Sequence, residues 1–174
     1  MSAYPWAAII LEKKIAPDKQ NDIDTASLRH IVALFNDQVQ TNSSTRFSGK
    51  RAWQEWIKLL KNGYACDNNM LIHLRYNRAS AVAYLQGMAK RYSGKTAKNI
   101  NAAAKLYEQA LDNLNKQGLP WNLVKNGKPA NEVQAEYTAM VKSVFKLEKK
   151  AIEHLRKALE SEGIKIATTK TVNK

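Results

Sequence analysis

Residues 131–161 read NEVQAEYTAMVKSVFKLEKKAIEHLRKALES, and this stretch carries the clearest structural signal in the chain. Its apolar residues recur at intervals of three and four, which places them on one face of an α-helix. They are Val133, Tyr137, Met140, Val144, Leu147, Ala151, Leu155 and Ala158. At 1.5 Å per residue this helix would be about 45 Å long. The spacing suits antiparallel packing against neighbouring helices, so the stretch predicts a helical bundle.

Four further segments have helical periodicity and recognisable ends. The predicted helices start at Asp22 or Asp24, at Gly49, at Asp67 or Asn68, and at Thr96. Residues 121–130 contain two Asn, one Gly and one Pro, and we expect an irregular connection there. The predicted fold is all-α: a five-helix bundle over 22–162, preceded by a short extended segment at 1–15 and followed by a flexible basic tail at 163–174.

The predicted N-terminal segment has a run of apolar residues that is typical of a β-strand. A lone strand cannot satisfy its own backbone hydrogen bonds, so it must pair with another chain, pack as an extended arm, or belong to a larger protein. Together with the aromatic side chain that anchors the irregular connection, this run forms the candidate interaction segment. Its residues are Trp6, Ile9, Ile10, Leu11 and Trp121.

The chain has 174 residues and a formal net charge of +13, with 28 Lys and Arg against 15 Asp and Glu. The basic residues are spread over nearly every segment, which favours a solvated lysine-rich surface. An alternative is a protein that binds polyanions such as nucleic acid non-specifically. No apolar run approaches the length of a membrane span, and no secretory signal precedes the bundle, so we expect a cytoplasmic protein.

Residues that could carry catalysis or bind a metal are few and scattered. His30, His73 and His154 fall on three different predicted helices, and none has a His or a carboxylate three or four residues later. Cys66 lies in a turn before a helix and is favoured as a structural or idle thiol. The sequence therefore predicts no catalytic residue, no metal and no cofactor.

Arg78 falls in the apolar stripe of the third predicted helix, where an unpaired charge is unfavourable. One interpretation is a structural ion pair with Glu55 or Glu108. The other is a pocket in which Arg78 binds an anionic group. Arg75, one turn earlier, extends either interpretation. The second interpretation leads to an alternative function, a small-ligand-binding bundle or an enzyme with a pocket lined by Arg and Glu.

Three spaced strings suggest a family. They are Gly49-x-x-Ala52-x-x-x-Trp56-Ile57-x-x-Leu60, Arg78-x-x-Ala81-x-x-Tyr84-Leu85 and Ala103-x-x-x-Tyr107. Over about half of the chain they resemble the helical C-terminal region of papain-like, double-glycine-peptidase-like bacterial proteins, a group that includes the acyltransferase of butirosin biosynthesis. The catalytic Cys and His of that family lie in a preceding domain, so no catalytic residue is carried over, and Cys66 does not inherit the role.

The resemblance implies an accessory helical domain that shapes a substrate cleft or mediates association. We therefore expect a non-catalytic accessory or protein-interaction domain, whose partner is another protein or a further copy of this chain. The small-ligand site and the polyanion surface are the two alternatives.

Overall fold

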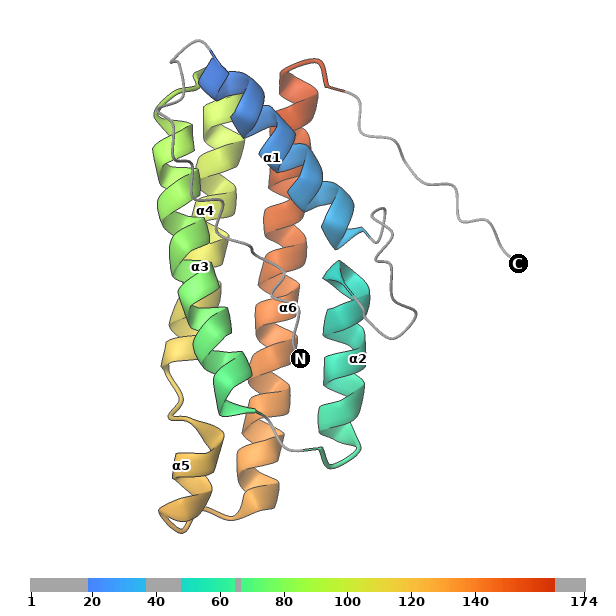
Figure 1. Ribbon diagram of the computed structural model, residues 1–174, viewed down its shortest axis with the longest axis vertical. Coiled ribbons are helices and arrows are strands. Elements are labelled where there is room, and N and C mark those ends of the chain that lie inside the picture. Colours follow the sequence, from blue (N-terminus) through green and yellow to red (C-terminus); the bar gives the residue numbers. More distant parts are fainter. Residues whose placement is uncertain (1–18, 37–47, 65–66, 165–174) are drawn as a thin grey trace, which may run out of the picture.

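Six helices make up the regular secondary structure in the part of the chain that the computed structural model describes, residues 19–36, 48–64 and 67–164 (Figure 1). They are α1 (Gln20–Phe35), α2 (Gly49–Lys61), α3 (Asn68–Ala89), α4 (Gly94–Asn115), α5 (Pro120–Lys125) and α6 (Ala130–Ser161). The all-α prediction is confirmed. The extended segment predicted at 1–15 and almost all of the predicted tail lie outside the described residues, as does Cys66.

The longest helix, α6, holds the centre of the bundle (Figure 1). Seven of the eight residues in its predicted apolar stripe are buried, and the eighth, Leu147, is partly buried. α4 packs along α6, α3 packs along α4, and α1 and α2 contact other parts of α6. The three-and-four periodicity therefore predicted both the helix and its buried face. None of the helices in the described ranges is long and apolar enough to cross a membrane.

The start of α1 differs from the prediction. Lys19, and neither Asp22 nor Asp24, occupies the N-cap position, so the helix begins earlier in the chain. Asp24 lies inside the helix and is fully buried, because its carboxylate is bound by Arg91 of the α3–α4 turn. A long-range ion pair has replaced the local capping role that the sequence suggested.

The starts of α3 and α4 were also tested by the structure. One predicted capping residue caps its helix, and the other bonds to a distant residue. Asp67 caps α3 as predicted, and its Oδ1 accepts a hydrogen bond of 2.8 Å from the backbone N–H of Asn69. Thr96 does not cap α4, because Ser93 occupies the N-cap position. The Thr96 hydroxyl is instead buried and donates to Glu162 at the end of α6, over a distance of 2.5 Å.

The connection predicted to be irregular at 121–130 contains a short helix, α5. Pro120 occupies its first turn, where the missing N–H is no loss and the fixed φ suits a helix. Gly127, with φ of +91°, ends the segment in the left-handed region. Because Pro and Gly bracket the helix so closely, the composition resembles that of a loop.

Gly49, the first residue of α2, lies very close to the end of α1. Its φ is +50°, and a Cβ at this position would lie 2.3 Å from the carbonyl oxygen of Leu34. The close approach and the positive φ both require glycine. α2 consequently starts directly against the end of α1, and its aromatic face is turned toward α6.

Candidate functional site

Arg78 is buried, with 6% of its surface exposed, and its Nε donates to Oε1 of Glu148 on α6. The carboxylate is itself only 2% exposed. The structure therefore confirms an ion pair for Arg78 and corrects its partner. Glu55 pairs with Lys58 at 3.6 Å, and Glu108 is exposed on α4. Both predicted partners stay near water, where a carboxylate is well solvated.

The second oxygen of Glu148 accepts a hydrogen bond of 3.2 Å from the indole N–H of Trp53 on α2. The indole stacks on Phe145, with ring centroids 5.9 Å apart, and this stacking orients the N–H toward the carboxylate. Glu148 thus receives hydrogen bonds from α2 and from α3. One buried carboxylate links three helices.

Electrostatics in this cluster favour the charged pair. Burial disfavours the cation, but the attraction and hydrogen bond from Glu148 outweigh that effect and raise the pKa of Arg78 above its ordinary value. The guanidinium carbon also lies 5.7 Å from the centre of the Tyr107 ring. Burial, and secondarily the negative charge of Glu148, raise the pKa of the Tyr107 phenol. Among the described residues, Nη1 of Arg78 has no hydrogen-bond partner.

The raised pKa of Tyr107 predicts a stability loss at alkaline pH. The folded protein keeps a phenol proton that the unfolded chain releases near pH 10, so the stabilisation is fully present below about pH 10 and is lost as the pH rises toward the folded-state pKa. We expect the free energy of unfolding to fall more steeply above about pH 10 for the wild type than for Tyr107→Phe. Urea unfolding at several pH values measures both slopes, and equal slopes would contradict the assignment.

Arg75 does not share the surroundings of Arg78. Its Nε and Nη2 donate to the carbonyl oxygen of Leu114 at 3.1 and 2.7 Å, and Nη2 also donates to the carbonyl oxygen of Gln117 at 2.7 Å. Leu114 lies in the last turn of α4, and Gln117 lies just beyond its C-cap. The last four carbonyl groups of an α-helix have no N–H partner within the helix. Arg75 is therefore a side-chain cap for α4, and a cation there also suits the negative end of the helix dipole.

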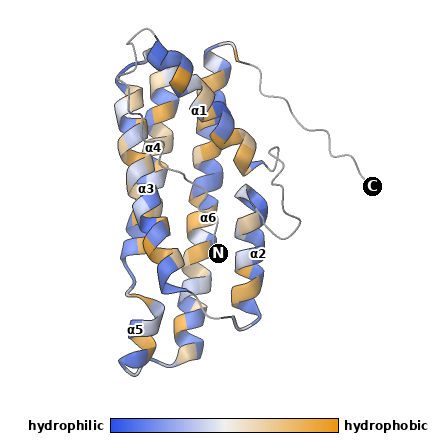
Figure 2. Ribbon diagram, in the orientation of Figure 1, coloured by the Kyte–Doolittle hydropathy of each residue, from blue (hydrophilic) through white to orange (hydrophobic). Residues whose placement is uncertain are grey.

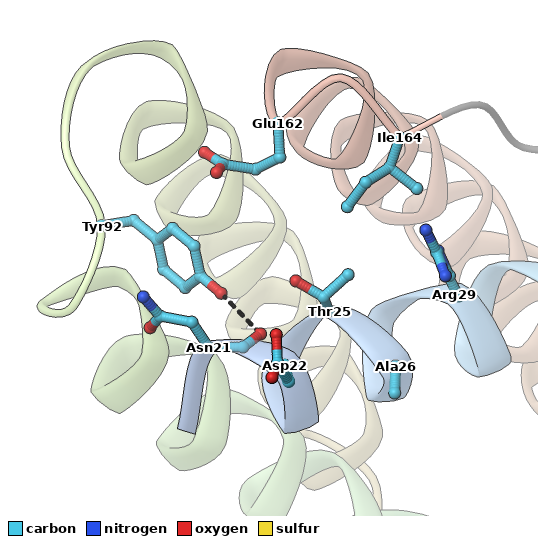
Figure 3. Close-up of a pocket in the computed structure, with 8 residues that line it drawn as sticks. All are labelled: Asn21, Asp22, Thr25, Ala26, Arg29, Tyr92, Glu162 and Ile164. Atoms are coloured by element: carbon cyan, nitrogen blue, oxygen red, sulfur yellow. Dashed lines mark hydrogen bonds between the residues drawn. The ribbon is translucent and has the colours of Figure 1, made fainter. Parts of the chain in front are cut away.

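A polar pocket of about 480 Å³ lies between the start of α1, the α3–α4 turn and the end of α6 (Figure 3), at the end of the bundle opposite α5 in Figure 1. It is lined by Asn21, Asp22, Thr25, Ala26, Arg29, Tyr92, Glu162 and Ile164. None of Arg75, Arg78, Glu55 and Glu108 takes part. The Tyr92 hydroxyl donates to the carbonyl oxygen of Asn21 at 3.3 Å, and this hydrogen bond joins two residues of the lining (Figure 3). With two carboxylates, a guanidinium and hydroxyls, the lining suits a small polar molecule.

The end of the bundle around α5 exposes large apolar side chains. We call this set the end patch: Leu59, Tyr64, Met70, Trp121 and Val124. Trp121 is 69% exposed, and apolar positions are visible on α5 in Figure 2.

Three hydrogen bonds hold together the helix ends that carry the end patch. The backbone N–H of Trp121 donates to Oδ1 of Asn68 at 3.1 Å, which fixes α5 to the start of α3. Nε2 of Gln134 on α6 donates to the carbonyl oxygens of Leu60 and Tyr64, which fixes the end of α2 to α6. Trp121 was predicted from the sequence, but the other four members were not, because they come from three separate helix ends.

Residues that could hold a metal do not gather anywhere in the part of the chain that the structure describes. His30 and His73 are exposed, and the ring nitrogen Nδ1 of His154 lies 3.0 Å from Oδ1 of Asn99 on α4. Comparison with known proteins found no matching family model, no matching curated protein and no matching solved structure. The papain-like resemblance accordingly stays a prediction, and the case for function rests on the surfaces of this chain.

Proposed function

We propose that this chain is a non-catalytic accessory or protein-interaction domain and that its end patch binds a partner protein. The observation that carries the proposal is Trp121, a large aromatic side chain that is 69% exposed on a short helix held in place by Asn68. Trp and Tyr are enriched at the centres of protein interfaces, where they supply much of the binding energy.

The rest of the end patch supports the same conclusion. Scattered apolar residues are normal on a protein surface, but a group of them at one end of a molecule is typical of an interaction site. Here the exposed set contains Tyr64, Met70 and Trp121, three of the residue types that interface cores favour. Covering them would remove apolar surface from water, which is the main favourable term in protein association.

The charge of the chain favours an acidic partner over a second copy. At a formal charge of +13, two copies repel one another, and an acidic surface is attracted. Lys58, Lys61 and Lys125 lie in the last turns of α2 and α5, near the end patch. Such rim charges would raise the association rate with an acidic protein.

Two further elements of the proposal come from the sequence alone. The apolar run with Trp6, Ile9, Ile10 and Leu11 would add a second contact to the partner, because an extended segment can pair with an open sheet edge. A papain-like catalytic domain is the partner that the family resemblance implies.

Trp121→Ala is the direct test of the proposal. The side chain is mostly exposed, and the backbone bond to Asn68 survives the substitution, so we expect the free energy of unfolding to change by no more than about 0.5 kcal/mol. Partner affinity should fall by about 30-fold or more, as for a central interface tryptophan. Quantitative affinity capture from the native cells compares wild type, Trp121→Ala and Gln109→Ala, an exposed control on α4. A partner retained equally by all three proteins would refute the proposal.

A further inference from the structure

The exposed side of the middle of α6 carries a group of four lysines, and Glu153, the exposed acid one turn further along, pairs with Arg156 at 3.0 Å. Between residues 137 and 152 the charged side chains are four Lys and one Glu. The single acid, Glu148, is buried and paired with Arg78, so it does not neutralise the surface. We call the exposed four the lysine face: Lys142, Lys146, Lys149 and Lys150.

The four lysines of this face project from one side of a rigid helix. Successive residues of an α-helix are about 100° apart, so the four positions fall within an arc of about 100° and extend over about 12 Å along the axis. Nζ of Lys149 lies 4.8 Å from the centre of the Phe145 ring, which restricts this cation. The helix backbone that carries the four lysines is already ordered, so only their side chains lose conformational freedom on binding.

The lysine face borders the seam between α4 and α6, where the exposed groups are polar. Nδ2 of Asn113 donates to the hydroxyl of Ser143 at 3.2 Å, and Asn99 contacts His154. The remaining exposed residues of α6 between 137 and 152 are Ala139 and Ser143. The surface therefore offers no aromatic ring for base stacking and no large apolar side chain for insertion into a membrane.

We propose that the lysine face binds the phosphate backbone of double-stranded nucleic acid without reading its sequence. A duplex presents closely spaced phosphates on a rigid surface, and a row of cations on a straight helix matches that form. Lysine is a point charge and, unlike arginine, does not recognise base edges through two parallel hydrogen bonds. This inference is independent of the protein partner, because the end patch lies on other helices.

The test compares a variant that lacks the four charges of the lysine face with a variant that lacks four other lysine charges. The face variant is Lys142→Gln with Lys146→Gln, Lys149→Gln and Lys150→Gln. The control variant is Lys50→Gln with Lys61→Gln, Lys90→Gln and Lys125→Gln, all exposed on other elements. Both variants lose the same formal charge, and exposed substitutions of this kind leave stability nearly unchanged. Circular dichroism verifies that each variant is folded.

Fluorescence anisotropy with a labelled DNA duplex of about two helical turns measures the affinity at several salt concentrations. We expect the face variant to bind at least about tenfold more weakly than the control variant, with a salt slope smaller than that of the wild type by about 2–4. Equal losses in the two variants would overturn the proposal, because affinity would then follow net charge alone. A wild type that prefers a single strand of equal length, or vesicles containing phosphatidylserine, over the duplex would overturn the assignment to duplex backbone.

Discussion

Glu148→Gln is expected to lower the free energy of unfolding by about 3–5 kcal/mol, the largest effect of any substitution considered for this chain. The substitution keeps the shape of the side chain and removes its charge, so no cavity forms. The guanidinium of Arg78 would then be buried without a counter-charge, with Nη1 already lacking a partner among the described residues. Equilibrium unfolding in urea measures the loss.

Two controls separate this effect from simple loss of an ion pair. Glu55→Gln removes the partner of Lys58 at a partly exposed site, where the pair contributes no more than about 1 kcal/mol. The double variant Arg78→Met with Glu148→Leu replaces the pair by apolar groups of similar size and should regain part of the lost stability, because the buried indole N–H of Trp53 then lacks its acceptor. A loss below about 1 kcal/mol in Glu148→Gln would mean that the pair is not part of the folded core.

Asp24→Asn is expected to have the next largest effect, a loss of about 2–3 kcal/mol. The carboxylate is fully buried and accepts hydrogen bonds from Arg91 at 2.8 and 2.9 Å, from the Tyr84 hydroxyl at 3.2 Å and from Gln20 at 3.0 Å. An amide in its place loses the charge and can accept fewer of these bonds. The effect is smaller than for Glu148 because Arg91 is partly exposed and can return to water.

Hydrogen exchange in α1 should distinguish Asp24→Asn from Asp22→Asn. Asp24 attaches α1 to the end of α3, so hydrogen exchange should accelerate most strongly in Gln20–Phe35. Asp22→Asn provides the matched control, because this side chain is exposed two residues earlier in the same helix. If α1 exchanges equally fast in the two variants, Asp24 does not hold the helix to the bundle.

The main helices could be predicted from local patterns in the sequence, namely the spacing of apolar residues and the residues at helix starts. The spacing of apolar residues in 131–161 predicted α6 to within one residue at its start, and Gly49 and Asp67 marked the starts of α2 and α3. The burial of Arg78 was also predictable, because it occupies a position in the apolar stripe of α3. These signals are local, and local signals are the ones that a single sequence carries.

The long-range partners were not predictable in the same way. Glu148 lies on the buried stripe of α6, between Val144 and Ala151, but it is charged and so is not part of the apolar pattern that predicts this stripe. A charged residue at such a position on each of two helices is the signal that could have paired Arg78 with Glu148. Asp24 offered no such signal, because Asp near a helix start is equally typical of a cap.

The polar pocket and the end patch, at the two ends of the bundle, could not be predicted from local sequence patterns either. The polar pocket is assembled from α1, the α3–α4 turn and the end of α6, which are far apart in the sequence. The end patch depends on α5, and the Pro and Gly that bracket this helix made the segment resemble a loop. Trp121 was identified only as the aromatic side chain that anchors the predicted irregular connection.

Site-specific photo-cross-linking at position 121 is the most direct test of the proposed interaction surface. Benzoylphenylalanine would replace Trp121 in one protein and the exposed Gln109 of α4 in the other, and both proteins would be irradiated in the native cells. The proposal predicts a discrete covalent adduct with one acidic polypeptide from position 121, and none from position 109. An absence of adduct at position 121, or the same adduct in equal yield at position 109, would contradict a docking role for the end patch.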